Sequence, residues 1–101
     1  MIIFTELLER AKIEKIAIHT TTEEQAIKLL SELDKKGYEW DNGEKLTDKT
    51  YYGVFRENTC YNFTPDFRPI LNKKIMYGPL DWYQDEGYTI IEFKDINFKE
   101  E

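Results

Sequence analysis

A chain of 101 residues has the usual size of one domain, and its hydrophobic share of 41% is too high for a disordered segment, so we expect residues 1–101 to form a single domain. Twenty acidic residues against 14 basic ones give a net charge of −6. Because the basic residues form no concentrated patch, the composition argues against direct binding of nucleic acid.

The chain is expected to begin with a short helix from Thr5 to Ile13, followed by a strand over residues 16–20. In the helix, Leu7, Leu8 and Ala11 share one face. The strand is apolar on both of its faces, which is typical of a strand covered on both sides.

The clearest element is an amphipathic helix from Glu23 to Lys36. Thr22 is suited to cap its first turn, and Gln25 three residues later completes a capping box. Gly37 supplies the left-handed residue that commonly ends a helix. Four residues are expected to form its apolar face: Ala26, Ile27, Leu30 and Leu33.

After this helix, a strand over residues 38–40 runs into the turn-forming sequence Asp41-Asn42-Gly43. The segment 47–58 is ambiguous between helix and strand. Asp48 could cap a short helix carrying Tyr51, Tyr52 and Phe55, although Gly53 disfavours that interpretation.

The second half of the chain is expected to be rich in strands, at residues 59–63, 74–77 and 88–93, with a helical turn or two over 80–86 and a polar tail. Pro65 and Pro69 bracket a loop around Phe67 and Arg68. The predicted class is α+β: one main amphipathic helix packed on a mainly antiparallel sheet of about four to five strands, with a short N-terminal helix.

No catalytic, metal or cofactor site is predicted. His19 and Cys60 are the only histidine and cysteine, so they could form a base–nucleophile pair only if the fold brings them together. A lone cysteine in an alternating strand is more often a buried packing residue. One histidine, one cysteine and dispersed carboxylates show no metal-ligand spacing. Without a signal peptide or a membrane-spanning run, we expect a cytoplasmic protein.

Two sites for binding can be proposed from the residues. In the first, His19, Thr20 and Thr21 lie just before the main helix and could hold a small anion at its N-terminus, while Tyr61 or Trp40 could stack on a nucleotide base. The structural alternative is that the threonines cap the helix and His19 is an ordinary loop residue.

The second is an aromatic and acidic surface for a partner protein. Tyrosine and tryptophan dominate interface hot spots, and several of these residues lie beside turns. The candidates are Trp40, Tyr51, Trp82 and Tyr83, with Asp81, Asp85 and Glu86 as a charged rim. The alternative is that Trp40 and Trp82 cap the ends of the core.

Several segments resemble small proteins of phages and prophages of Gram-positive bacteria. Among them are Ala17-Ile18-His19-Thr20, Thr22-Glu23-Glu24-Gln25-Ala26, Glu57-Asn58-Thr59-Cys60-Tyr61 and Gly87-Tyr88-Thr89-Ile90-Ile91-Glu92-Phe93. The resemblance extends over most of the chain from position 16 to position 96. It implies an accessory protein of a mobile element in a bacterial host cell and offers no catalytic residues to carry over.

The leading hypothesis is a non-enzymatic phage or prophage accessory protein that binds a host protein through its acidic, aromatic surface, as an inhibitor of a bacterial defence system (anti-CRISPR-like). The alternative is a protein that binds or sequesters a small, nucleotide-like anion. A third reading is an enzyme that uses Cys60 or paired carboxylates. A homo-oligomer is left open, since the last strand could pair across a two-fold axis if it lies at a sheet edge.

Overall fold

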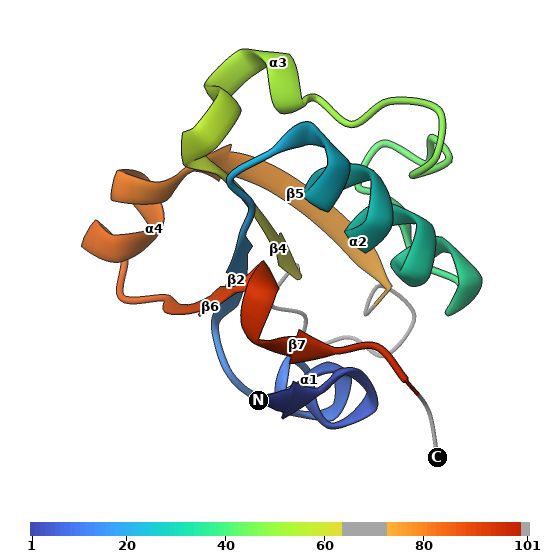
Figure 1. Ribbon diagram of the computed structural model, residues 1–101, viewed down its shortest axis with the longest axis vertical. Helices are drawn as coiled ribbons and strands as arrows, with labels where there is room; N and C mark the ends of the chain where they lie inside the picture. The colour runs from blue at the N-terminus through green and yellow to red at the C-terminus, as the bar shows by residue number, and fades with distance from the viewer. Residues whose placement is uncertain (64–72, 100–101) are drawn as a thin grey trace.

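A computed structural model describes residues 1–63 and 73–99, which form helices around a sheet of five strands (Figure 1). The strand order is β3 (Glu39–Trp40), β5 (Lys74–Pro79), β4 (Thr59–Phe63), β2 (Ile16–His19) and β6 (Thr89–Glu92). The predicted α+β class is confirmed. The sheet is mixed, because the two central pairings are antiparallel while both edge strands run parallel to their neighbours.

The helices cover both faces of this sheet. One face packs on α1 (Phe4–Arg10) and α2 (Glu23–Lys35), and the other on α4 (Leu80–Asp85). Successive residues of β2 show the division, because Ile16 and Ile18 belong to the core beneath α2 whereas Ala17 packs in the cluster of Tyr83. All four residues of β2 are buried, which confirms the predicted strand covered on both sides.

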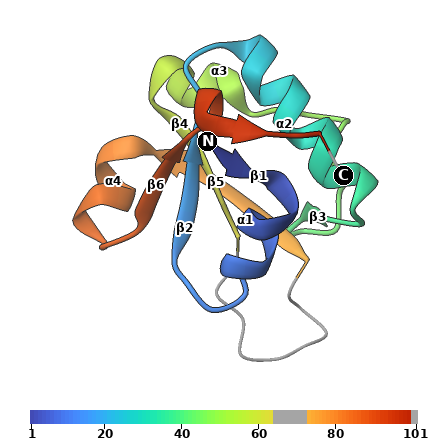
Figure 2. The ribbon, with the colours of Figure 1, turned by 60° about the horizontal axis from the view of Figure 1, so that its bottom comes forward.

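The predicted polar tail is wrong in part, because it contributes to the core. After η3 (Phe93–Asp95), β7 (Ile96–Asn97) pairs in parallel with β1 (Ile2–Ile3) to form a second, two-stranded sheet. Ile96 is buried, and the ring of Phe98 lies 4.9 Å from that of Phe4. Figure 2 shows the N-terminus beside β7.

The main helix is formed as its capping sequence predicts. The Oγ1 atom of Thr22 accepts a hydrogen bond from the Gln25 N–H at 3.1 Å. The side-chain oxygen of Gln25 accepts a hydrogen bond from the Thr21 N–H at 2.8 Å. Gly37 follows the helix with φ of 89°.

One residue of its predicted apolar face is misplaced. Ile27 is 53% exposed, and Leu29 is buried in its stead. Successive helical residues are about 100° apart. Ile27 therefore lies just outside the arc defined by Ala26, Leu29, Leu30 and Leu33.

The ambiguous segment 47–58 forms two short helices, α3 (Tyr52–Phe55) and η1 (Arg56–Asn58). Asp48 does not cap α3. Instead, the backbone N–H of Tyr52, the first residue of α3, donates a hydrogen bond to the Thr50 hydroxyl at 3.1 Å. Tyr51, between them, has a left-handed conformation with φ of 56°. The predicted loop around Phe67 and Arg68 lies outside the described residues.

Candidate functional site

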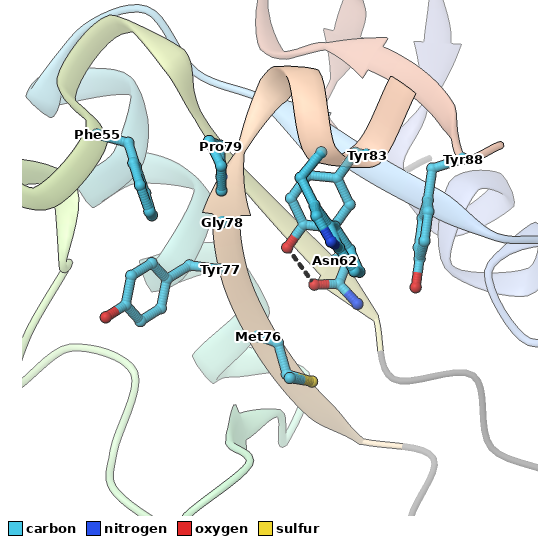
Figure 3. Close-up of a pocket in the computed structure, with 9 residues that line it drawn as sticks. Phe55, Asn62, Met76, Tyr77, Gly78, Pro79, Tyr83 and Tyr88 are labelled. Carbon is cyan, nitrogen blue, oxygen red and sulfur yellow. Dashed lines mark hydrogen bonds between the residues drawn. The ribbon is translucent and has the colours of Figure 1, made fainter. Parts of the chain in front are cut away.

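A groove of about 500 Å³ lies where α4 folds back over the sheet beside β5 (Figure 3). We call it the α4 groove. Aromatic and apolar side chains dominate its lining, which consists of Phe55, Asn62, Met76, Tyr77, Gly78, Pro79, Trp82, Tyr83 and Tyr88.

The floor of the α4 groove depends on a close contact between β5 and α4. A Cβ atom on Gly78 would lie 3.1 Å from the hydroxyl oxygen of Tyr83, so the absence of a side chain lets the tyrosine approach the strand. The Tyr83 hydroxyl donates to Oδ1 of Asn62 at 2.5 Å. Asn62 is 3% exposed and also donates from Nδ2 to the carbonyl of Phe63. The polar floor is therefore bonded internally.

Two large apolar side chains of the α4 groove are exposed to solvent. Trp82 is 48% exposed and Met76 is 41% exposed. The Trp82 ring packs edge-on against the buried Tyr83, with centroids 5.0 Å apart and planes at 86°. Trp82 thus offers accessible apolar area that is already held in place by a buried neighbour.

Three carboxylates flank Trp82 in the sequence of α4 and of the turn after it. Asp81, Asp85 and Glu86 are exposed, and Oδ1 of Asp81 accepts the backbone N–H of Trp82 at 2.9 Å. Nζ of Lys15 lies 5.5 Å from the ring centroid of Tyr88, which lines the groove. The predicted rim residues are therefore exposed neighbours of Trp82 in sequence, and none of them lines the α4 groove.

The prediction that Trp40 and Tyr83 lie on the binding surface is wrong, because both side chains are buried. Trp40 is 2% exposed and its indole N–H donates to the Lys49 carbonyl at 3.2 Å. Tyr83 is 1% exposed, since it is the residue by which α4 packs on the sheet. Tyr51 is half-buried and lies outside the α4 groove, with its ring stacked on Tyr77 at 4.6 Å.

Sequence reasoning missed the part of the groove that β5 supplies. Met76 and Gly78 alternate with Ile75 and Tyr77 in a strand, so they share a face. In the sequence, that alternation directly before the short helix that carries Trp82 could have indicated that Met76 and Gly78 lie near this helix. It does not indicate which strand pairs with β5.

The predicted anion site is not formed, because its ring nitrogens and hydroxyls have partners within the protein. The side chain of His19 contacts the Glu92 carboxylate through Nδ1 at 2.9 Å and the Glu57 carbonyl through Nε2 at 2.7 Å. The Thr20 hydroxyl is buried and donates to the carbonyl of Thr59 at 3.1 Å. His19 is thus a buried residue of β2 rather than a loop residue.

The other two members of that site are also engaged. The N–H and the hydroxyl of Thr21 both point to Oε1 of Gln25. Tyr61 is 1% exposed and donates its hydroxyl to the Thr50 carbonyl at 2.6 Å, so it cannot stack on a base. Glu23 and Glu24 in the first turn of α2 add negative charge where the anion would lie.

Cys60 lies opposite His19 in the pairing of β4 with β2, yet the two do not form a nucleophile–base pair. Both ring nitrogens of His19 are occupied, as described above. Cys60 is fully buried. Burial, with the nearby charge of Glu92, raises the pKa of its thiol to about 12. The reactive thiolate is therefore strongly disfavoured at neutral pH.

The buried thiol predicts a pH dependence of stability. In the unfolded chain the thiol has a pKa near 9, so as pH rises it loses its proton before the folded thiol does. The free energy of unfolding should therefore fall as pH rises from about 9 to 12. The slope should be at most about 1.4 kcal/mol per pH unit. Burial also raises the pKa of Tyr61 and Tyr83 from 10, which adds to the loss only at higher pH.

Urea denaturation at several pH values checks this expectation. In the wild type the free energy of unfolding should begin to decline near pH 9, whereas in Cys60→Ala the decline should begin near pH 10. Equal slopes for the two proteins between pH 9 and 10 would contradict the raised pKa of Cys60.

Among residues 1–63 and 73–99, no group of three or more His, Cys, Asp or Glu side chains is arranged to hold a metal ion. In the same part of the chain, none of the helices has the length and apolar character needed to cross a membrane. Comparisons with protein-family models, curated proteins and solved structures found no match to this chain. The resemblance to phage proteins stays a prediction.

Proposed function

We propose that this chain is a non-enzymatic binding protein that docks a partner protein on the α4 groove. The observation that carries the proposal is the exposed Trp82, held against Tyr83 in the groove that the exposed Met76 also lines. Tryptophan is among the residues most enriched in interface hot spots. Contiguous exposed apolar surface rimmed by polar residues commonly marks an interaction site.

The charge favours a basic partner. The net charge of −6 gives long-range attraction to a positive surface, and two exposed carboxylates, Asp81 and Asp85, lie on the same helix as Trp82. In the setting that the sequence resemblance implies, the partner would be a host protein that handles nucleic acid. Occupying its basic face would inhibit a defence system of the bacterial host.

The nucleotide-like anion has less support than a partner protein. The residues predicted to hold it are engaged in internal hydrogen bonds, and Tyr61 is buried. Among the described residues that line it, the α4 groove has no cationic side chain to attract such a ligand.

The experiment is a pull-down from a Gram-positive host lysate with the tagged wild type, Trp82→Ala and Ile27→Ala, followed by affinity measurements on the captured protein. We expect Trp82→Ala to weaken binding about 30-fold, which corresponds to about 2 kcal/mol. The affinity of the wild type should also fall as salt is raised.

Ile27→Ala is the matched control, because Ile27 is a comparably exposed apolar residue on α2, outside the α4 groove. It should bind like the wild type. A circular dichroism melt of each variant verifies that the fold is intact. Retention of the partner by folded Trp82→Ala at wild-type affinity would overturn the proposal.

A further inference from the structure

The edge of β5 next to the α4 groove is only partly covered. β3 pairs with Lys74 and Ile75, and its chain then leaves the sheet after the bond from the Asp41 N–H to the carbonyl of Ile75. The four residues of β5 from Met76 to Pro79 have no strand on that side among the described residues. Such an edge is a template for pairing with another chain.

The register shows which backbone groups point off this edge. The Thr20 N–H bonds the carbonyl of Thr59, so alternate residues of β4 starting from Thr59 direct their backbone groups to β2. The intervening residues of β4 therefore bond β5, at Met76 and Gly78. Tyr77 lies between those two, so its N–H and C=O point away from β4.

Within residues 1–63 and 73–99, no turn or neighbouring strand bonds these two groups of Tyr77. Tyr77 therefore presents one donor and one acceptor side by side, the arrangement that a closely spaced pair of an antiparallel ladder uses. The open stretch is short, because Pro79 has no N–H and β3 covers the other end.

The α4 groove connects this edge to Trp82. In Figure 3, Phe55 and Tyr77 lie on one side of β5, and Tyr83 and Tyr88 lie on the other. Trp82 of α4 also lines the groove. The Tyr83 ring lies over the buried Gly78 and forms the floor of the groove. A long side chain entering from the edge can lie along this floor.

We propose that the partner segment binds as a short extended strand that exchanges two hydrogen bonds with Tyr77 and lays an arginine along the α4 groove onto the Trp82 ring. This inference rests on the proposed function and names the form and chemistry of the partner. A strand added to β5 would lie about 4.8 Å from it, and its alternate side chains would lie on the face of the sheet that carries α4. The planar guanidinium stacks on tryptophan, where Asp81 and Asp85 are close in sequence and exposed.

An extended segment fits this surface better than a helix does. A helix bonds its own backbone groups and would leave the N–H and C=O of Tyr77 without partners. In strand addition, main-chain bonds supply part of the affinity while alternate side chains enter pockets. The two open groups and the α4 groove are used together only by a strand.

Amide hydrogen exchange followed by NMR tests the edge and the added strand together. The probe is a capped peptide of alternating valine and arginine, with a glutamate analogue and a copy N-methylated on its central backbone amide. In the free protein, the Tyr77 amide should exchange faster than those of Met76 and Gly78, which bond β4. Saturation with the arginine peptide should slow exchange at Tyr77 at least 10-fold, and the N-methylated copy and the glutamate analogue should not.

The outcomes separate this inference from the proposed function. If the arginine peptide shifts the Trp82 and Met76 resonances but leaves exchange at Tyr77 unchanged, groove binding stands and strand addition is wrong. A Tyr77 amide already protected in the free protein would also overturn strand addition. Equal binding of the glutamate analogue would overturn the choice of arginine. If the peptide leaves both Trp82 and Tyr77 unchanged, the inference fails, while the pull-down with Trp82→Ala still decides the proposed function.

Discussion

Trp40→Ala is expected to lower the free energy of unfolding by about 3–5 kcal/mol, the range for deleting a buried large aromatic side chain. The Trp40 ring lies 4.9 Å from that of Tyr51 and 6.0 Å from those of Tyr61 and Tyr77, so its removal leaves a cavity among aromatic neighbours. The total free energy of unfolding of a native protein is about 5–15 kcal/mol. The variant should therefore lose a large fraction of its stability.

Urea denaturation followed by far-ultraviolet circular dichroism measures this loss without relying on tryptophan fluorescence. Trp40→Phe should lose less stability than Trp40→Ala, because it keeps an aromatic ring, although it gives up the hydrogen bond to the Lys49 carbonyl. Trp82→Ala is the matched control, since its ring is 48% exposed, and it should cost under about 1 kcal/mol. Equal midpoints for Trp40→Ala and the wild type would mean that Trp40 is not a core residue.

Tyr83→Ala should destabilise the protein to a similar degree, about 3–5 kcal/mol. Tyr83 is the buried residue of α4, and its ring packs with Ala17 and Cys60. Loss of the ring should detach α4 and remove one wall of the α4 groove. Partner binding would then be lost although Tyr83 itself is inaccessible, so a binding assay alone would mistake it for a contact residue.

A double-mutant cycle distinguishes packing from polar pairing at this position. Tyr83→Phe keeps the ring but leaves Oδ1 of buried Asn62 without its hydroxyl donor, which should cost about 1–3 kcal/mol. Asn62→Leu should cost a similar amount by leaving the hydroxyl without an acceptor. The double variant should lose clearly less than the sum. Strict additivity would contradict the hydrogen bond.

The local elements were predictable because their signals are local. Thr22 and Gln25 define the start of the main helix and Gly37 its end, each within a few residues of the helix terminus, and the structure confirms them. Ile27 was misassigned because a pattern of apolar residues fixes the direction of a helix face only to within about one residue step, and the neighbouring Leu29 competes for the same arc.

The candidate site could be predicted only in part, because exposure depends on contacts distant in sequence. Trp40 and Trp82 both lie beside turns and look alike in the sequence. The first is buried because β5 and the segment after the turn pack around it, whereas the second lies on the outer side of a short helix. Likewise, His19 is removed from solvent by Glu92 and Glu57, which lie 73 and 38 positions away.

The parallel pairing of β1 with β7 affects the order in which the chain can fold as it is synthesised. Ile2 pairs with Ile96, and β2 has β6 beside it only after Glu92 has been made. Synthesis must therefore pass Glu92 before β6 can join the five-stranded sheet, and pass Asn97 before β7 can pair with β1. Until then β2, apolar on both faces, lacks its cover on one edge, and chaperones that hold exposed strands would have most opportunity to act. The many long-range pairings also favour slow folding over rapid local assembly.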